Sequence, residues 1–129
     1  MGRIFALLIL VVVTTSGCPF NLADVRFLPT EMQASAKSER TFALAKEVEI
    51  SQLPCGYSRT LRNGTRWDLV GELPKGAIYR SKDQSLTLEC SNVYEAYLVI
   101  EEDSLVGFYL PVEKGFVRVS DPIRLPIKK

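Results

Sequence analysis

The side chains that could do chemistry in this chain are three cysteines, Cys18, Cys55 and Cys90, in a sequence that has no histidine. Without histidine, neither a Ser-His-Asp nor a Cys-His nucleophile can form, and zinc sites that contain histidine are also excluded. None of the cysteines belongs to a Cys-x-x-Cys motif, the pattern typical of thiol redox enzymes. We therefore expect the cysteines to serve in modification and cross-linking.

Cys18 follows a segment that has the layout of a secretory signal. Arg3 is the only charge before it, and the apolar run 4–13 is followed by the small residues Ser16 and Gly17. This run is too short for a membrane-spanning helix, which needs about 20 apolar residues. A basic start, a short apolar region and small residues at the end predict a cleaved signal peptide.

The cysteine directly after Ser16-Gly17 resembles the lipobox of bacterial lipoproteins. In that family the thiol receives a diacylglycerol, and the chain is then cleaved in front of the cysteine. The resemblance implies a signal peptide over residues 1–17 and a lipid on Cys18 that anchors the protein in the cell envelope, facing the periplasm. Pro19 stands where Asp is associated with inner-membrane retention, so the outer membrane is the expected location. An ordinary cleaved signal, with Cys18 incidental, is the alternative.

Cys55 and Cys90 remain as a pair once Cys18 is assigned to the lipid. An oxidising compartment favours a disulfide between them. Closing a loop of this length stabilises a fold by roughly 3–4 kcal/mol in the chain-entropy model. Two separate buried thiols are the alternative.

The charged residues give little support for a nucleic-acid partner or for a catalytic site. Because Arg3 lies in the signal, 15 Lys and Arg remain against 15 Asp and Glu, without a basic block. This mixture argues against a nucleic-acid or polybasic membrane footprint. The acidic cluster 101–103 lacks the glycine and spacing of a calcium loop, and we expect it to be a solvated hairpin tip. We expect no catalytic residue, metal or cofactor.

Residues 41–129 are expected to form one all-β domain, with residues 18–40 as a tether that holds it off the membrane. Apolar residues alternate from Thr41 to Ile50 with the period of a strand. Asn63-Gly64 lies between two alternating runs and predicts a type I′ hairpin. That hairpin would place Arg59 opposite Asp68, and Thr60 opposite Trp67.

Residues 93–110 are the longest hairpin candidate, with a loop at 101–104. This loop would place Tyr97 opposite Phe108, and Val99 opposite Val106. Both faces of the hairpin are apolar, so one face must line the core and the other needs cover. Tyr94 and Tyr109 fall on the second face, and we interpret them as an exposed partner-binding surface. The alternative is that barrel curvature or the segment 22–28 buries this face.

About seven short strands with turn residues between them predict a small antiparallel β-barrel or a compact sandwich. The succession from Gly64 to Leu110 (Gly-Thr-x-Trp, Val-Gly-x-Leu-Pro-x-Gly, Ile-Tyr, Leu-Val-Gly-Phe-Tyr-Leu-Pro) looks like the SH3-like barrels of bacterial periplasmic proteins. The resemblance covers about half of the expected mature chain and implies a fold without implying a site.

Two functions fit these expectations. The first is a non-catalytic module, anchored to the membrane through Cys18, that binds an envelope protein or a peptidoglycan partner. The second is an inhibitor of an envelope-directed enzyme. Residues 76–81 (Gly-Ala-Ile-Tyr-Arg-Ser) are similar to the Gly-Ala-x-Tyr segment of small lipoproteins that inhibit c-type lysozyme, which are also disulfide-pinned β-barrels.

Overall fold

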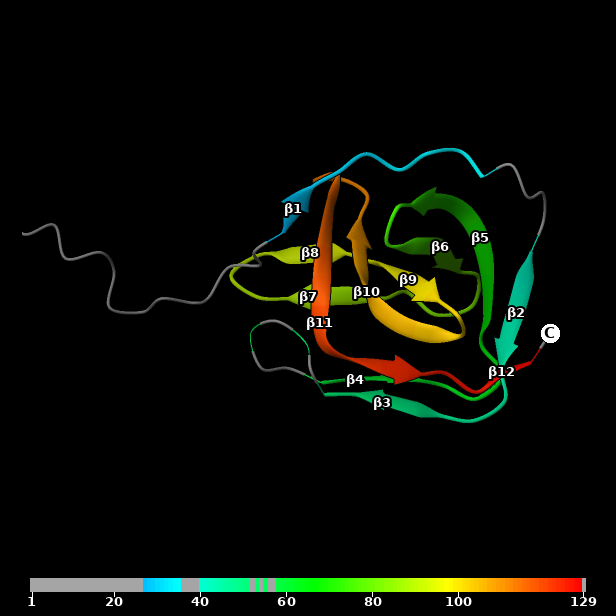
Figure 1. The fold of residues 1–129 in the computed structure, drawn as a ribbon. Coiled ribbons are helices and arrows are strands. Elements are labelled where there is room, and N and C mark those ends of the chain that lie inside the picture. Colours follow the sequence, from blue (N-terminus) through cyan, green and yellow to red (C-terminus); the bar gives the residue numbers. More distant parts are fainter. Residues whose placement is uncertain (1–26, 36–39, 52, 54, 56–57, 129) are drawn as a thin grey trace, which may run out of the picture.

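The computed structural model describes residues 27–35, 40–51, 53, 55 and 58–128, and this part of the chain is all-β and antiparallel (Figure 1). Eight of its strands form one sheet in the order β1-β11-β10-β9-β6-β5-β2-β12, while β3–β4 and β7–β8 form two short ribbons. The strands are β1 (Leu28–Pro29), β2 (Thr41–Leu44), β3 (Val48–Ile50), β4 (Arg59–Leu61), β5 (Arg66–Leu73), β6 (Gly76–Ser81), β7 (Thr87–Glu89), β8 (Val93–Glu95), β9 (Tyr97–Glu101), β10 (Ser104–Leu110), β11 (Gly115–Arg124) and β12 (Ile127–Lys128).

The expected all-β class is confirmed, and a sandwich of short strands describes it. β1 and β12 are the two edges of the eight-stranded sheet among the described residues, so the sheet does not close into a complete barrel. β11 nevertheless leads through residues 125–126 into β12, which pairs with β2 at the far edge. The sheet is therefore strongly curled, because β11 lies next to one edge strand and the chain continues from it directly into the other edge strand.

The alternating run that starts at Thr41 is one strand bent into two. β2 pairs with β5 and β3 pairs with β4 in the same register, so residues 41–50 and 59–68 form a single long hairpin with a corner in it. At the corner, the Gly64 amide donates to the Leu44 carbonyl at 2.8 Å, and the Leu44 amide donates to the Thr65 carbonyl at 3.0 Å. The corner directs β2 and β5 into the sheet and β3 and β4 into a separate ribbon.

Asn63 and Gly64 form the corner and not the end of a hairpin. The Thr65 amide donates to the Arg62 carbonyl at 3.2 Å, and Gly64 has φ of +82° while Asn63 stays outside the left-handed region. This fits a type II turn, which needs φ > 0 only at its third residue. The predicted pairs Arg59–Asp68 and Thr60–Trp67 are wrong, because β4 pairs with β3 and β5 pairs with β2 and β6.

The hairpin of β9 and β10 turns at Glu102 and Asp103, whose φ values of 49° and 62° fit a type I′ turn. Next to the turn, Ile100 pairs with Leu105, as a loop at 101–104 requires. A β-bulge at Val106 then shifts the register by one residue, so Tyr97 pairs with Tyr109 and Val99 with Gly107. The predicted pairs Tyr97–Phe108 and Val99–Val106 are therefore wrong.

The main core lies between the inner face of the sheet and the two ribbons. Trp67 is fully buried there, and its indole Nε1 donates to Thr65 Oγ1 at 3.1 Å. The Thr65 hydroxyl in turn donates to the Arg62 carbonyl at 2.8 Å. A buried indole N–H needs such a partner, since leaving it unpaired costs free energy. Other fully buried members of this core include Ile50, Leu61, Leu88, Leu98 and Phe108.

A second apolar cluster covers the opposite face of the sheet. It contains Leu73, Ile78, Val99, Tyr109 and Phe116. Residues 27–35, which we call the N-terminal arm, run along this side of the sheet: Met32 packs against the second cluster, while Phe27 packs against the main core. β1 pairs with β11, and Gln33 and Glu72 exchange two backbone hydrogen bonds of 2.9 and 2.8 Å. The predicted tether over 18–40 is therefore wrong for residues 27–35, which belong to the folded domain.

The predicted disulfide between Cys55 and Cys90 is confirmed, with 5.5 Å between the two Cα atoms. It ties the segment between β3 and β4 to the end of β7. Arg59 links the same two ribbons: its Nε donates to the Thr87 carbonyl at 3.1 Å, and its guanidinium lies 3.0 Å from Glu89. The predicted signal peptide and the lipidation site Cys18 lie outside the described residues.

Replacing both disulfide cysteines, Cys55→Ala with Cys90→Ala, should lower the free energy of unfolding by about 2–4 kcal/mol, because the unfolded chain regains the entropy of the open loop. Urea unfolding measures this difference. Reduced wild-type protein is the matched control and should lose the same amount. Equal unfolding midpoints for oxidised and reduced protein would contradict a structural role for the bridge.

Candidate binding cleft

The two tyrosines predicted to contact a partner are both core residues. Tyr94, in β8, pairs with Leu88 across the β7–β8 ribbon and is 7% exposed. Tyr109, in β10, is 3% exposed and belongs to the cluster on the other face of the sheet. The structure does not bring the two side chains together, and the expected exposed surface is not found.

Three structural features explain why Tyr94 and Tyr109 are buried. β8 leaves the predicted hairpin and pairs with β7, and the Val106 bulge changes the register of β10. The N-terminal arm then covers Tyr109, whose hydroxyl oxygen accepts a hydrogen bond from the Met32 amide at 3.3 Å. The alternative for this face was burial by barrel curvature or by the segment 22–28; among the described residues the cover comes from Met32, which lies outside that segment.

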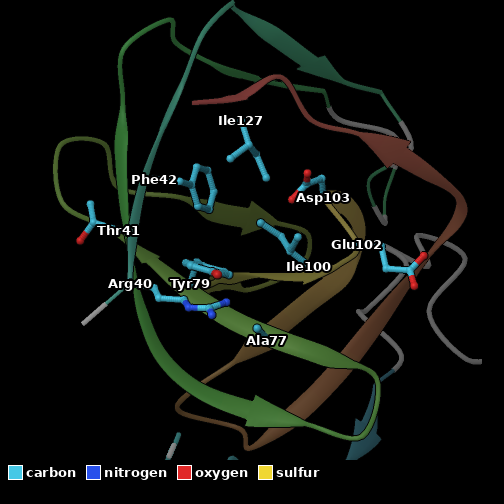
Figure 2. A pocket seen from close by; sticks show the side chains of 9 residues that line it. All are labelled: Arg40, Thr41, Phe42, Ala77, Tyr79, Ile100, Glu102, Asp103 and Ile127. Atoms are coloured by element: carbon cyan, nitrogen blue, oxygen red, sulfur yellow. The ribbon is translucent and has the colours of Figure 1, made fainter. Parts of the chain in front are cut away.

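A cleft of about 570 Å³ lies inside the curl of the sheet (Figure 2). β2, β6, β9 and β12 supply its walls, together with the turn between β9 and β10. Its lining residues are Arg40, Thr41, Phe42, Ala77, Tyr79, Ile100, Glu102, Asp103 and Ile127. The volume lies within the range of roughly 300–1,000 Å³ that is typical of small-ligand sites.

Aromatic and aliphatic side chains form the floor of the cleft. The rings of Phe42 and Tyr79 meet edge to face, with 4.8 Å between their centroids and 69° between their planes. Ile100 and Ile127 lie beside them in Figure 2. Tyr79 is fixed from both sides, because it pairs with Leu69 of β5 and with Leu98 of β9. The floor is therefore preformed.

The two rims of the cleft carry opposite charges. Arg40 precedes β2, and its guanidinium lies beside the Tyr79 ring, while the Asp103 carboxylate faces the cleft from the other side (Figure 2). Backbone hydrogen bonds hold both rims: the Leu69 amide donates to the Arg40 carbonyl at 2.8 Å, and the Leu125 amide donates to the Asp103 carbonyl at 2.9 Å. The side chains of Thr41 and Glu102 point away from the centre.

The pKa of Tyr79 is raised above its ordinary value, mainly because burial disfavours the phenolate. Asp103 and Glu72 raise it further, while Arg40 acts in the opposite direction. The phenol is therefore neutral at physiological pH and can both donate and accept a hydrogen bond. Within the described residues its hydroxyl has no hydrogen-bond partner, so both functions are available to a ligand.

The chemical groups that line the cleft are limited in kind. Its lining contains no cysteine, lysine or serine, and the Thr41 hydroxyl is engaged with Asp68 Oδ1 at 2.6 Å. The described residues contain no group of three or more Cys, Asp or Glu side chains that could hold a metal ion. What the arrangement offers is an aromatic surface, one neutral phenol, and separate positive and negative groups.

Sequence reasoning did not identify this site. It placed Asp103 in a hairpin tip and Tyr79 in a strand, both correctly, but gave Arg40 to the tether. These three residues lie far apart in the sequence and come together only through the curl of the sheet. The one local signal was the 76–81 segment, which forms β6 and contributes Ala77 and Tyr79 to the cleft.

No protein-family model, curated protein or solved structure matches this chain. In the part of the chain that the structure describes, no helix has the length and apolar character needed to cross a bilayer.

Because Tyr109 is buried, Tyr109→Ala should lower the free energy of unfolding by about 3–5 kcal/mol, the usual cost of removing a buried aromatic ring. Tyr109→Phe is the matched control. It keeps the ring and loses only the hydrogen bond to Met32, at a cost of about 1 kcal/mol. Chemical denaturation measures both. A Tyr109→Ala protein within 1 kcal/mol of wild type would show that the ring is not part of the core.

Proposed function

We propose that this protein is a bacterial envelope lipoprotein, anchored through Cys18, whose β-domain is a non-catalytic binding module. The lipobox-like cysteine after a short apolar segment supports the anchor. The disulfide between Cys55 and Cys90 supports an oxidising compartment such as the periplasm. The outer membrane is the proposed location, because Pro19 follows the modified cysteine.

The observation that carries the binding role is the cleft, with its aromatic floor between Arg40 and Asp103. A ligand that suits it has a carboxylate for Arg40, an amine for Asp103 and a compact body that can lie on Tyr79 and Phe42. Short peptides have this combination, and the peptide stems of the cell wall carry both groups close together. We therefore propose a cell-wall peptide as the ligand.

Soluble stem peptides should bind to the purified protein, and isothermal titration calorimetry measures the affinity. Arg40→Gln and Asp103→Asn should each weaken binding about fivefold or more, since each removes a charge-assisted hydrogen bond worth on the order of 1 kcal/mol or more. Arg118→Gln, on an exposed position of β11 outside the cleft, is the matched control and should bind normally.

Two results would overturn the peptide assignment. One is the absence of any binding to peptides that carry both charges. The other is binding that remains unchanged in both Arg40→Gln and Asp103→Asn, which would place the peptide elsewhere on the molecule.

The anchor has a separate test. Cys18→Ser should abolish lipid attachment, so the protein should either leave the membrane fraction or retain residues 1–17. Membrane fractionation and intact mass of the product measure both outcomes. A Cys18→Ser protein that is normally processed and still fully membrane-bound would rule out the lipid anchor.

Inhibition of an envelope-directed enzyme is the second candidate. The segment that is similar to lysozyme inhibitors forms β6, and its Ala77 and Tyr79 line the cleft. On this alternative, a loop of the enzyme would occupy the cleft in place of a peptide. A lysis assay with c-type lysozyme distinguishes the two candidates, because only an inhibitor slows lysis at stoichiometric concentration.

A further inference from the structure

The docked N-terminal arm leaves only a short connection between the domain and the proposed anchor. Phe27 packs at the margin of the main core and lies close to Gly115. Nine residue steps separate it from Cys18. A fully extended chain of that length spans at most about 30 Å. The end of the domain that carries Phe27 must therefore stay close to the bilayer, on the proposed assignment of Cys18 as the lipidated residue.

This end of the domain is well defined. β1 pairs with β11 immediately after the turn that joins β10 to β11, and the Thr30 amide donates to the Lys114 carbonyl of that turn at 2.9 Å. In Figure 1, β1 lies at one end of the molecule, while β2, β12 and the C-terminus lie at the opposite end. Two of the strands that line the cleft, β2 and β12, therefore lie at the end of the molecule opposite β1.

Exposed apolar side chains occur at the end of the molecule that carries β1. Leu28 in β1 is 63% exposed and Val112 in the β10–β11 turn is 74% exposed, two of the three large apolar residues that are most exposed in the described chain. A small apolar hollow of about 190 Å³ lies beside Leu28, lined also by Pro74 and Phe116. The third residue, Val93, lies in β8.

Two lysines lie at this end of the domain, together with Glu31 and Glu113. Lys75 lines the same apolar hollow, and Lys114 pairs with Glu31 at 3.5 Å in an exposed position. Lysine side chains can lay their aliphatic stems along apolar material and keep the ammonium group among lipid headgroups. Apolar side chains beside lysines are the composition that favours the interfacial region of a membrane.

We infer that Leu28, Val112 and the β10–β11 turn rest on the bilayer that holds the lipid, and that the cleft faces the aqueous space. The inference rests on the proposed lipid anchor. The bilayer is the occupant of this surface because the eight residues between Cys18 and Phe27 keep it in permanent reach. The ligand of the cleft therefore approaches from the side away from the membrane, without competing with the membrane contact.

Spin labelling of the full-length lipoprotein in liposomes tests this orientation. Single cysteines are introduced by Leu28→Cys and Val112→Cys, with Lys128→Cys in β12 as the matched control at the cleft end. The disulfide keeps Cys55 and Cys90 unreactive, and the lipid blocks Cys18. Electron paramagnetic resonance then measures how often each label collides with oxygen, which concentrates in lipid, and with a water-soluble nickel complex.

The oxygen-to-nickel collision ratio should rise several-fold at positions 28 and 112 relative to the same labels in a soluble Cys18→Ser protein. It should stay unchanged at position 128. Unchanged ratios at 28 and 112 in lipidated protein would overturn the orientation and leave the anchor intact. A mass spectrum that shows no lipid on Cys18 would overturn the anchor and the orientation together. A rise at position 128 alone would show the reverse orientation.

Discussion

Apolar side chains on both faces of the eight-stranded sheet place the strongest constraint on this structure, because each face must be covered. A sheet that is solvated on one face alternates apolar and polar residues, whereas β9 and β10 are buried along nearly their whole length. The two ribbons cover one face, and the N-terminal arm covers the other. The corner at Gly64 exists because the long hairpin must contribute to the sheet and also to its cover.

The ribbons and the N-terminal arm determine which parts of the sheet are buried and where a cleft remains. The disulfide and Arg59 hold the two ribbons together over the main core. On the other face, Met32 and β1 protect Tyr109 and Phe116. Neither cover extends over the space between β2, β12 and β6, so the cleft remains there with a floor made by Phe42 and Tyr79. An unfilled end of the core has thus become the candidate site, and the charges of Arg40 and Asp103 give it polarity.

Sequence reasoning succeeded where the signal is local. The period-two runs and the Cys55–Cys90 bridge could be predicted from neighbouring residues or by elimination. It failed where the conformation of one or two residues changes the strand pairing of all the residues that follow. Asn63-Gly64 is as compatible with a corner as with a hairpin end, and a bulge at Val106 leaves no mark in the hydrophobic pattern.

Local sequence signals were also insufficient to identify the candidate site, as the wrongly assigned tyrosines show. Tyr109 lies on an apolar face that needs cover, as predicted, but the cover is the arm, whose few apolar residues have no period of their own. The cleft could not be predicted because Arg40, Tyr79 and Asp103 come from three distant segments. Only the pairing of β12 with β2 and of β6 with β9 brings them together.

Hydrogen exchange at the arm tests most directly whether it is a structural cover of the sheet. The Thr30 amide donates to the Lys114 carbonyl and the Gln33 amide to the Glu72 carbonyl, both at 2.9 Å. If the arm is part of the fold, these two amides exchange far more slowly than in an unstructured peptide, because opening them exposes the apolar cluster beneath. Exchange of both amides at the rate of an unstructured chain would contradict this account of the fold.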